Sequence, residues 1–579
     1  MSTGMSYFSR SAAMSTVRLS SGSSSLFWIT LAAFALTILF VSPLRETGVD
    51  DDWSYALTVE HLLQTGSYRS HGWLTANMPF QAYWGSLFAR VLGYSFTSLR
   101  ISTLALVFPG LIAFYFLARE HHLNAMQAGL AMLALCASPL VVRFSFSFNT
   151  DVPFLMCFII ALFLYTRAIK LESYPLMFLG SIAAGVAILT RQFGFVLPAG
   201  VFFVWALHKE HRGKVLFYSI GLILPALAVL WQLSAGMLMP TWTQRHVLYR
   251  QGILFANIET LLSNIIWRPA VILHYLALFS LPFVLLALLA FAPEVRQRRS
   301  SKLQVLLPAV CALYLLGSVI YGHFAHQRPW ILPYISWEAT LANMSRWQRV
   351  GLTLVTFAGA TLYARMLVLR YSTSHGWEKV GPHERLLDLC MLFLLVEHLI
   401  FRTFGDRYLL GFLPFILIVV GRYLGSWLNR WRMVMVMVCL AMLVTSAVWT
   451  RGLMVKEEAE WTAAESIRAA GIEPKYIFGY WVWNMYHGAA DDYMAEIGDS
   501  ALQASTDDFW LRFLPQRREQ AQFLTVASVP PPSNEKWELI KEVPYTDSLF
   551  RLKHIYVVKR GTHASLPTDT VQDHGTERR

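Results

Sequence analysis

The sequence predicts a polytopic α-helical membrane protein with a long first external loop and a small α/β extracytoplasmic domain at its C-terminal end. Of its 579 residues, 55% are hydrophobic and only 15% are charged, and the mean hydropathy is +0.44. Soluble globular proteins carry about 25% charged residues. A deficit of charge spread over most of the chain therefore indicates many membrane spans rather than one soluble core.

Apolar segments of spanning length alternate with short polar segments, and they predict about 13 transmembrane helices. The expected spans are residues 26–44, 98–118, 125–142, 152–169, 174–190, 193–207, 215–235, 270–292, 303–321, 350–369, 386–401, 408–425 and 432–450. The first is interpreted as a retained helix and not as a signal peptide, because it is long enough to span and no clean small-residue cleavage site follows it.

The distribution of lysine predicts the orientation. The lysines among the first 450 residues are Lys170, Lys209, Lys214, Lys302 and Lys379. All five fall in cytoplasmic loops if the N-terminus is cytoplasmic, which satisfies the positive-inside rule. The net charge of +12 is thereby explained by topology, and no nucleic-acid partner is implied. An odd number of spans gives an N-in, C-out protein of the cytoplasmic (inner) membrane.

The composition changes after residue 450. Residues 1–450 are expected to form the transmembrane domain, residues 451–560 an extracytoplasmic soluble domain, and residues 561–579 a disordered polar tail. Within the soluble domain, the helical spacing of apolar residues predicts a helix over 461–470, and strands are expected at 476–478 and 550–558.

The first external loop, residues 45–97, contains three consecutive acids, Asp50, Asp51 and Asp52. Apolar residues at helical spacing follow, so the acids are expected at a helix N-terminus, where one carboxylate caps the helix and offsets its dipole. Three acids exceed that role. At least one is therefore a candidate catalytic residue, and Tyr55, which follows closely, is a candidate substrate contact.

Asp151 lies where the third span leaves the membrane and the fourth returns, with Pro153 just inside the helix. Taken alone, this pattern is that of a helix cap. The predicted topology, however, places Asp151 on the same side of the membrane as Asp51. The two carboxylates are candidates to share an acceptor hydroxyl, a divalent metal cation or a phosphate environment.

The external loops contain arginine but no lysine, and arginine is the better residue for forked contacts to phosphate. Contacts to lipid headgroups are the alternative role for each of these arginines. The candidate donor-phosphate ligands are Arg191, Arg245, Arg402 and Arg407. Gln192 and Tyr408, each next to one of these arginines, are candidate substrate-binding residues.

These motifs resemble the GT-C glycosyltransferases that use polyprenyl-phosphate sugars, such as the bacterial lipid A aminoarabinose transferases and the protein O-mannosyltransferases. The resemblance is carried by Asp51-Asp52-Trp53-Ser54-Tyr55, Leu62-Leu63-Gln64-Thr65-Gly66-Ser67-Tyr68, Leu99-Arg100-Ile101-Ser102, Thr150-Asp151-Val152-Pro153-Phe154, Leu189-Thr190-Arg191-Gln192 and Asp406-Arg407-Tyr408-Leu409-Leu410. Family members often carry a basic residue and Pro-Pro late in the first loop. This chain instead has Ala76-Asn77-Met78-Pro79, with no lysine.

The resemblance implies that the first-loop acid pair contains the catalytic aspartate, with Asp51 favoured over Asp52, and that Asp151 matches a second family aspartate. It further implies transfer of a sugar from a polyprenyl-phosphate donor to a hydroxyl of a glycan, lipid or protein, on the outer face of the membrane and with inversion. A divalent cation held by Asp51 and Asp151 is a possible cofactor. The alternative is a transporter or flippase of a lipid-linked intermediate, but no internal repeat supports it.

Overall fold

The computed structural model describes residues 24–74, 77–237, 258–297, 309–310, 312–317, 345–372, 381–401, 405–497, 509–527 and 537–561. Two predicted phosphate ligands, Arg245 and Arg402, lie outside these residues, as does all but the first residue of the predicted tail. The span predicted at 303–321 is described only in part.

The N-terminal half is helical from its first described residue. Its helices are α1 (Ser24–Val41), α2 (Asp52–Thr65), α3 (Pro79–Leu92), α4 (Phe96–Glu120), α5 (Ala125–Ala137), α6 (Pro139–Ser145), α7 (Asp151–Leu171), α8 (Tyr174–Thr190), η1 (Gln192–Phe195), α9 (Val196–Leu207), η2 (Lys209–His211) and α10 (Val215–Met237). Further along follow α12 (Ile258–Phe279), α13 (Leu281–Gln297), α16 (Arg346–Ser372), α17 (Pro382–Ile400), η3 (Asp406–Phe412), α18 (Leu413–Arg430) and α19 (Arg432–Ala469).

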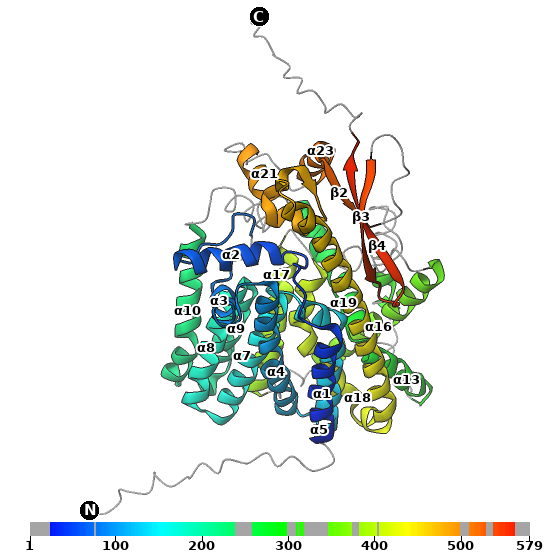
Figure 1. Cartoon of the computed structure of the whole chain (residues 1–579). Helices are drawn as coiled ribbons and strands as arrows, with labels where there is room; N and C mark the ends of the chain where they lie inside the picture. The colour runs from blue at the N-terminus through cyan, green and yellow to red at the C-terminus, as the bar shows by residue number, and fades with distance from the viewer. Residues whose placement is uncertain are drawn as a thin grey trace, which may run out of the picture.

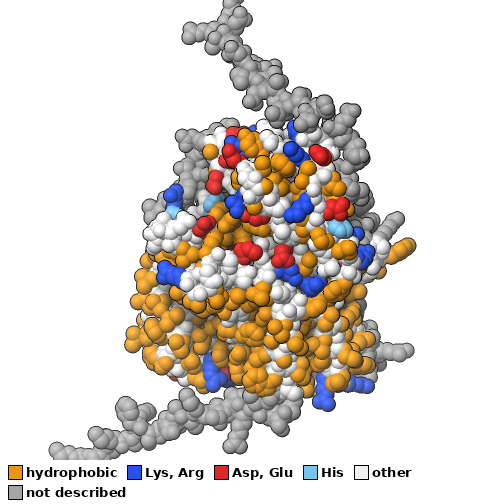
Figure 2. Space-filling view, in the orientation of Figure 1, with side chains coloured by type: hydrophobic (Ala, Val, Ile, Leu, Met, Phe, Trp, Pro, Cys, Tyr) orange, Lys and Arg blue, Asp and Glu red, His pale blue; other side chains and the backbone are white. Residues whose placement is uncertain are grey.

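Within the described residues, seven helices are long and apolar enough to cross a membrane, and an eighth span results if the bent pair α5 and α6 is counted as one. Four more apolar helices are shorter, including α8 and the η1–α9 segment. Figure 2 shows the face of the molecule on which apolar side chains cover the lower, helical part and charged side chains gather above it. The protein is therefore a multi-pass membrane protein, whereas the count of 13 spans stays a prediction.

Several helical assignments differ from the sequence prediction. The span expected at 125–142 is divided into α5 and α6, which are bent relative to each other by 59°. The span expected at 270–292 is interrupted at Ser280, between α12 and α13. Pro282 lies in the first turn of α13, where it lacks the N–H that a continuous helix would bond to the preceding turn. The first external loop also contains a second helix, α3, which begins with Pro79 at its N-terminal position.

The C-terminal region continues directly from the last long helix. α19 runs from Arg432 to Ala469 without interruption, so the domain boundary predicted at residue 450 falls inside a helix. The predicted helix at 461–470 is the end of α19. The remaining elements are η4 (Pro474–Tyr476), α20 (Trp481–Asn484), η5 (Met485–Ala489), α21 (Ala490–Ile497), η7 (Phe509–Phe513), α23 (Leu514–Gln520) and the four strands β1 (Ile477–Phe478), β2 (Phe523–Val526), β3 (Trp537–Thr546) and β4 (Leu552–Arg560).

The strands form one sheet in the order β1-β2-β4-β3, in which β1 pairs with β2 in parallel and the other pairs are antiparallel. The predicted strands at 476–478 and 550–558 correspond to β1 and β4. Figure 1 shows the sheet above the helices, with α2 lying across the upper end of the helical part. The Tyr480 hydroxyl donates to the Gly48 carbonyl oxygen at 2.9 Å. The C-terminal region thus contacts the loop that carries the three acids.

Candidate functional site

Arg100 holds the backbone that leads into the three acids. It lies in the first turns of α4 and its side chain is fully buried. Its guanidinium donates to four carbonyl oxygens at 2.7–2.8 Å, those of Pro43, Arg45, Thr47 and Phe146. A buried guanidinium needs such partners for its donors. Arg100 thereby joins the first external loop to the segment before Asp151.

Asp50 forms an ion pair at the turn before α2, with its side chain 24% exposed. Its backbone is in the left-handed region, with φ at 51°, which Asp tolerates better than most residues. Arg143, in the last turn of α6, donates one nitrogen to both carboxylate oxygens of Asp50, at 2.9 and 3.0 Å. This ion pair fixes the turn from which Asp51 and Asp52 follow.

Asp52 is buried and joins two segments of the chain through hydrogen bonds. One carboxylate oxygen accepts the Val49 amide at 3.1 Å, and the other accepts the Phe148 amide at 2.8 Å and the Asn149 side-chain amide at 3.0 Å. Burial raises the pKa of this carboxyl from 3.8 to about 8, with the Arg100 charge opposing the shift. Both carboxylate oxygens of Asp52 therefore already accept hydrogen bonds, and these bonds indicate a structural role.

Asp51 occupies the N-cap position of α2 but makes no side-chain capping bond. Its carboxylate instead pairs with Arg407 of η3, with Oδ2 and Nη2 2.7 Å apart. The Asp51 side chain is 30% exposed. Of the two acids that the family resemblance marks, Asp51 is therefore the accessible one.

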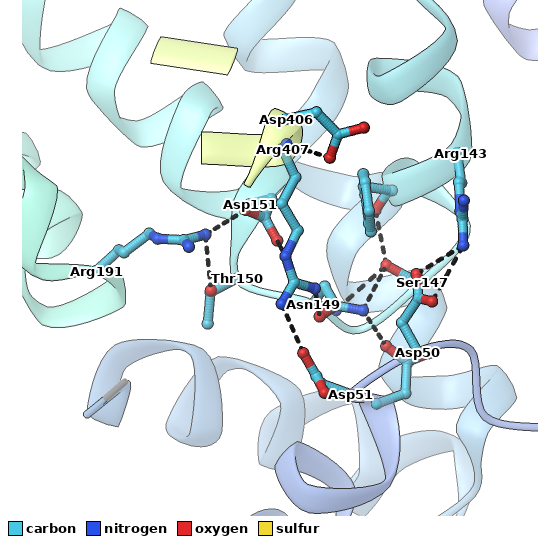
Figure 3. A network of polar contacts seen from close by, with 12 residues as sticks. Asp50, Asp51, Arg143, Ser147, Asn149, Thr150, Asp151, Arg191, Asp406 and Arg407 are labelled. Carbon is cyan, nitrogen blue, oxygen red and sulfur yellow. Dashed lines mark hydrogen bonds and ion pairs between the residues drawn. The ribbon is translucent and has the colours of Figure 1, made fainter. Parts of the chain in front are cut away.

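Asp151, the first residue of α7, lies beside this pair (Figure 3). Its side chain is only 2% exposed, and one oxygen pairs with Arg191, which also donates to the Thr150 hydroxyl at 3.3 Å. The other oxygen lies 3.9 Å from Nε of Arg407. Arg407 thus joins Asp51 to Asp151, the two carboxylates that the predicted topology places on one side of the membrane.

The two arginines lie against aromatic rings. The guanidinium of Arg191 is 4.6 Å from the ring centre of Tyr408 and 5.0 Å from that of Phe193. Arg407 lies 5.7 Å from the Tyr408 ring. Such stacking leaves the edge of a guanidinium open for hydrogen bonds while its face is held. Tyr408 is therefore a support for both arginines.

The other predicted substrate contacts differ in their surroundings. Tyr55, one turn into α2, is buried, and both this burial and the nearby Asp51 carboxylate raise the pKa of its hydroxyl. Its hydroxyl therefore stays protonated near neutral pH. Gln192 is half-buried at the start of η1.

Asn149 is a site residue that sequence reasoning did not single out. Its side chain is fully buried. Its amide nitrogen donates to Asp52 at 3.0 Å, and its amide oxygen accepts from Arg407 at 3.3 Å. The only available signal was its place two residues before Asp151. Asn149 connects the structural acid Asp52 to the Arg407 that pairs with Asp51.

The residues predicted to hold a divalent cation do not fit that role in this arrangement. Asp51 and Asp151 are each paired with a guanidinium, and Arg407 lies between them. A cation placed between the carboxylates would be repelled by Arg407. Among the residues that the structure describes, no group of three or more His, Cys, Asp or Glu side chains forms a candidate metal site.

A family comparison agrees with the resemblance drawn from the motifs. Residues 76–235 match the model of the dolichyl-phosphate-mannose-protein mannosyltransferase family. The resemblance to glycosyltransferases that use polyprenyl-phosphate sugars is thereby confirmed over that segment. A relative in Aquifex aeolicus (strain VF5), described as an uncharacterized protein, is 29% identical over 185 residues, which are 31% of this chain and 37% of the relative.

Two solved structures match most of this chain at low sequence identity. ArnT from Cupriavidus metallidurans in the apo state is 13% identical with a TM-score of 0.46, and the match covers 93% of this chain and 98% of that one. The oligosaccharyltransferase AglB from Archaeoglobus fulgidus is 11% identical with a TM-score of 0.43, with 87% and 69% covered.

Proposed function

We propose that this protein is a membrane glycosyltransferase that moves a sugar from a polyprenyl-phosphate donor to an acceptor hydroxyl, with Asp51 as the general base. The observation that carries the proposal is the cluster of Asp51, Asp151, Arg191 and Arg407, in which two acids and two arginines from four separate segments meet at one place. Transfer from a sugar phosphate needs both a base for the hydroxyl and positive charge for the leaving phosphate.

Arg191 and Arg407 are proposed to bind the donor phosphate. Both guanidiniums are largely buried, with side chains 11% and 22% exposed, so their charges act in a medium of low dielectric. The aromatic rings of Phe193 and Tyr408 fix their orientation. Charge held in place before the reaction stabilises the phosphate as negative charge develops on it.

Asp51 is proposed to take the proton of the acceptor hydroxyl. It is more exposed than the other carboxylates of the cluster, at 30% against 2% for Asp151. The hydroxyl oxygen attacks the anomeric carbon while the bond from that carbon to the phosphate oxygen breaks. The bonding electrons leave with the phosphate, the proton passes to Asp51, and attack opposite the leaving group inverts the anomeric centre.

Asp151 is proposed as a positioning residue. Its carboxylate orients Arg191 directly and lies within 3.9 Å of Arg407. The buried Asp151 thus lies close to both proposed phosphate ligands, Arg191 and Arg407. Asp52 is assigned the structural role that its three hydrogen bonds support, and no step passes through a metal.

The predicted topology places this cluster on the periplasmic or external side of the cytoplasmic membrane, where no nucleotide sugar is available. A lipid-linked donor agrees with that location. The match of residues 76–235 to a family named for dolichyl-phosphate-mannose supports the same donor class.

The test uses the purified full chain in liposomes containing undecaprenyl phosphate linked to labelled mannose, glucose or galactose. Envelope lipid, glycan and protein fractions serve as acceptors. We expect label to move to one fraction with release of undecaprenyl phosphate. Movement of the intact lipid-linked sugar across the bilayer with no bond cleavage would instead support a transporter.

A further inference from the structure

Two buried amide side chains near the acid–arginine cluster each have one polar atom without a hydrogen-bond partner. Asn77 precedes α3 and is 2% exposed, and Gln232 lies near the end of α10 and is 6% exposed. Among the residues described, Nδ2 of Asn77 and Oε1 of Gln232 have no partner. An unpaired buried polar group costs about 1–3 kcal/mol, so a pair of them indicates a ligand.

The neighbouring hydrogen bonds fix which atom of Gln232 is unpaired. Its Nε2 donates to two carbonyl oxygens, that of Asn77 at 2.9 Å and that of Ile188 at 3.0 Å. Two acceptors require the amino group at this position, so the amide cannot be turned round. The unpaired atom of Gln232 is therefore an acceptor.

The same argument applies to Asn77. The Met78 amide donates to the Tyr68 hydroxyl at 3.1 Å, and that hydroxyl is 2.7 Å from Oδ1 of Asn77. Were the amide turned round, its amino group would face the hydroxyl, whose proton would then have no acceptor among the described residues, so the proton is donated to Asn77 Oδ1. The unpaired atom of Asn77 is therefore the Nδ2 donor.

Asn77 and Gln232 are joined by the bond from Gln232 Nε2 to the Asn77 carbonyl oxygen, and their unpaired donor and acceptor match a hydroxyl group, which both accepts and donates. A phosphate oxygen only accepts, and the Gln232 oxygen would repel it. Aromatic rings adjoin the pair, since Tyr68 lies 5.8 Å from Trp231 and 6.3 Å from Tyr83, both of which are partly exposed. Amides with aromatic faces form a surface suited to the hydroxyl edge and apolar face of a sugar.

The position of the two amides indicates that their ligand is the sugar of the donor. Gln232 is bonded to Ile188 in the last turn of α8, and Arg191 immediately follows that helix. Gln232 therefore contacts the backbone about one helical turn before the proposed phosphate ligand in the chain. A sugar is covalently joined to its phosphate. If that phosphate binds at Arg191, the sugar must therefore lie close to Gln232.

We propose that Asn77 and Gln232 form a subsite for hydroxyl groups of the donor's sugar. This inference rests on the proposed glycosyl transfer and adds how the sugar is recognised.

The test compares binding of undecaprenyl phosphate with binding of its hexose conjugate, using whichever of mannose, glucose or galactose wild type transfers best. Asn77→Asp keeps the oxygen that Tyr68 bonds, replaces the unpaired donor with a carboxylate oxygen and adds a negative charge, which the control variant matches. We expect about tenfold weaker binding of the hexose conjugate and unchanged binding of undecaprenyl phosphate. Gln232→Met, which removes the unpaired acceptor together with the two bonds that Nε2 makes, is expected to act in the same direction.

Asn429→Asp is the matched control, since Asn429 is an exposed amide that also accepts a side-chain hydrogen bond, from Asn124. Equal weakening of both lipids by Asn77→Asp, or no change in either, would overturn the subsite. A raised KM for the acceptor with unchanged donor binding would overturn the assignment to the donor. Failure of wild type to bind either lipid or to transfer sugar would refute the proposed function itself.

Discussion

Arg407 Nη2 lies 2.7 Å from Asp51 Oδ2, and the same guanidinium presents Nε to Asp151 at 3.9 Å. One side chain thus connects the acid after the first membrane helix to the acid at the start of α7. Its Nη1 also lies 3.3 Å from the Asn149 oxygen. The planar fork of arginine is what allows three such contacts in different directions.

Replacing Arg407 with lysine is therefore expected to impair transfer although the charge is kept. An ammonium is a point charge and cannot reach Asp51, Asn149 and Asp151 together. We predict a fall in kcat of about 100-fold or more, in the range seen on losing one group that stabilises developing charge. Steady-state transfer assays measure it, with Arg430→Lys, at the end of α18, as control. Near-wild-type kcat for Arg407→Lys would refute the bridging role.

Asp52 gives a prediction for the pH dependence of stability. Its pKa is raised from 3.8 to about 8 by burial, so between these values the folded protein holds a proton that the unfolded chain has lost. Stability from this group is therefore greatest at low pH and falls as pH rises toward 8, by at most about 1.4 kcal/mol per pH unit.

Asp52→Asn removes this titration, so its thermal stability is expected to fall less steeply between pH 5 and 8 than that of wild type. Thermal unfolding in detergent at several pH values measures the slope. Asp491→Asn, at a carboxylate that is 59% exposed, is the comparison. An equal change of slope in both variants would contradict the assignment to Asp52.

Arg100 is predicted to matter for both stability and activity. Arg100→Met fills a similar space but leaves four carbonyl oxygens without their donors. Loss of about 3–5 kcal/mol is expected, as on breaking a buried charged network, and transfer should fall because the loop before Asp51 loses its anchor. Arg119→Met, in the last turn of the same helix, should be close to neutral by thermal unfolding. Equal stability of the two variants would refute the anchoring role.

Sequence reasoning placed Asp51, Asp151, Arg191 and Arg407 together because topology alone puts their loops on one side of the membrane. It favoured Asp51 over Asp52 through the family resemblance alone, without a physical reason for the difference. That difference depends on how the loop packs against residues 147–149, where Asp52 becomes buried and Asp51 stays accessible. Arg100 and Asn149 were passed over for the same reason, since their partners are backbone groups and side chains distant in sequence.

Parts of the fold were missed where composition and helical structure disagree. The chain becomes polar after residue 450 and so suggested a boundary. Yet α19 continues, with a Lys456–Glu460 pair one turn apart at 3.0 Å along its surface. Conversely, α12 and α13 form one apolar run in sequence, and only the proline in the first turn of α13 marks the break.

The most direct test of the central claim is the rate of sugar transfer by Asp51→Asn from undecaprenyl-phosphate hexose in liposomes. The substitution keeps the shape of the side chain and removes the base. The account predicts a fall of about 10²–10⁴-fold with undecaprenyl-phosphate binding retained and with Asp491→Asn as active as wild type. Transfer by Asp51→Asn within about tenfold of wild type would contradict the assignment of Asp51 as the general base.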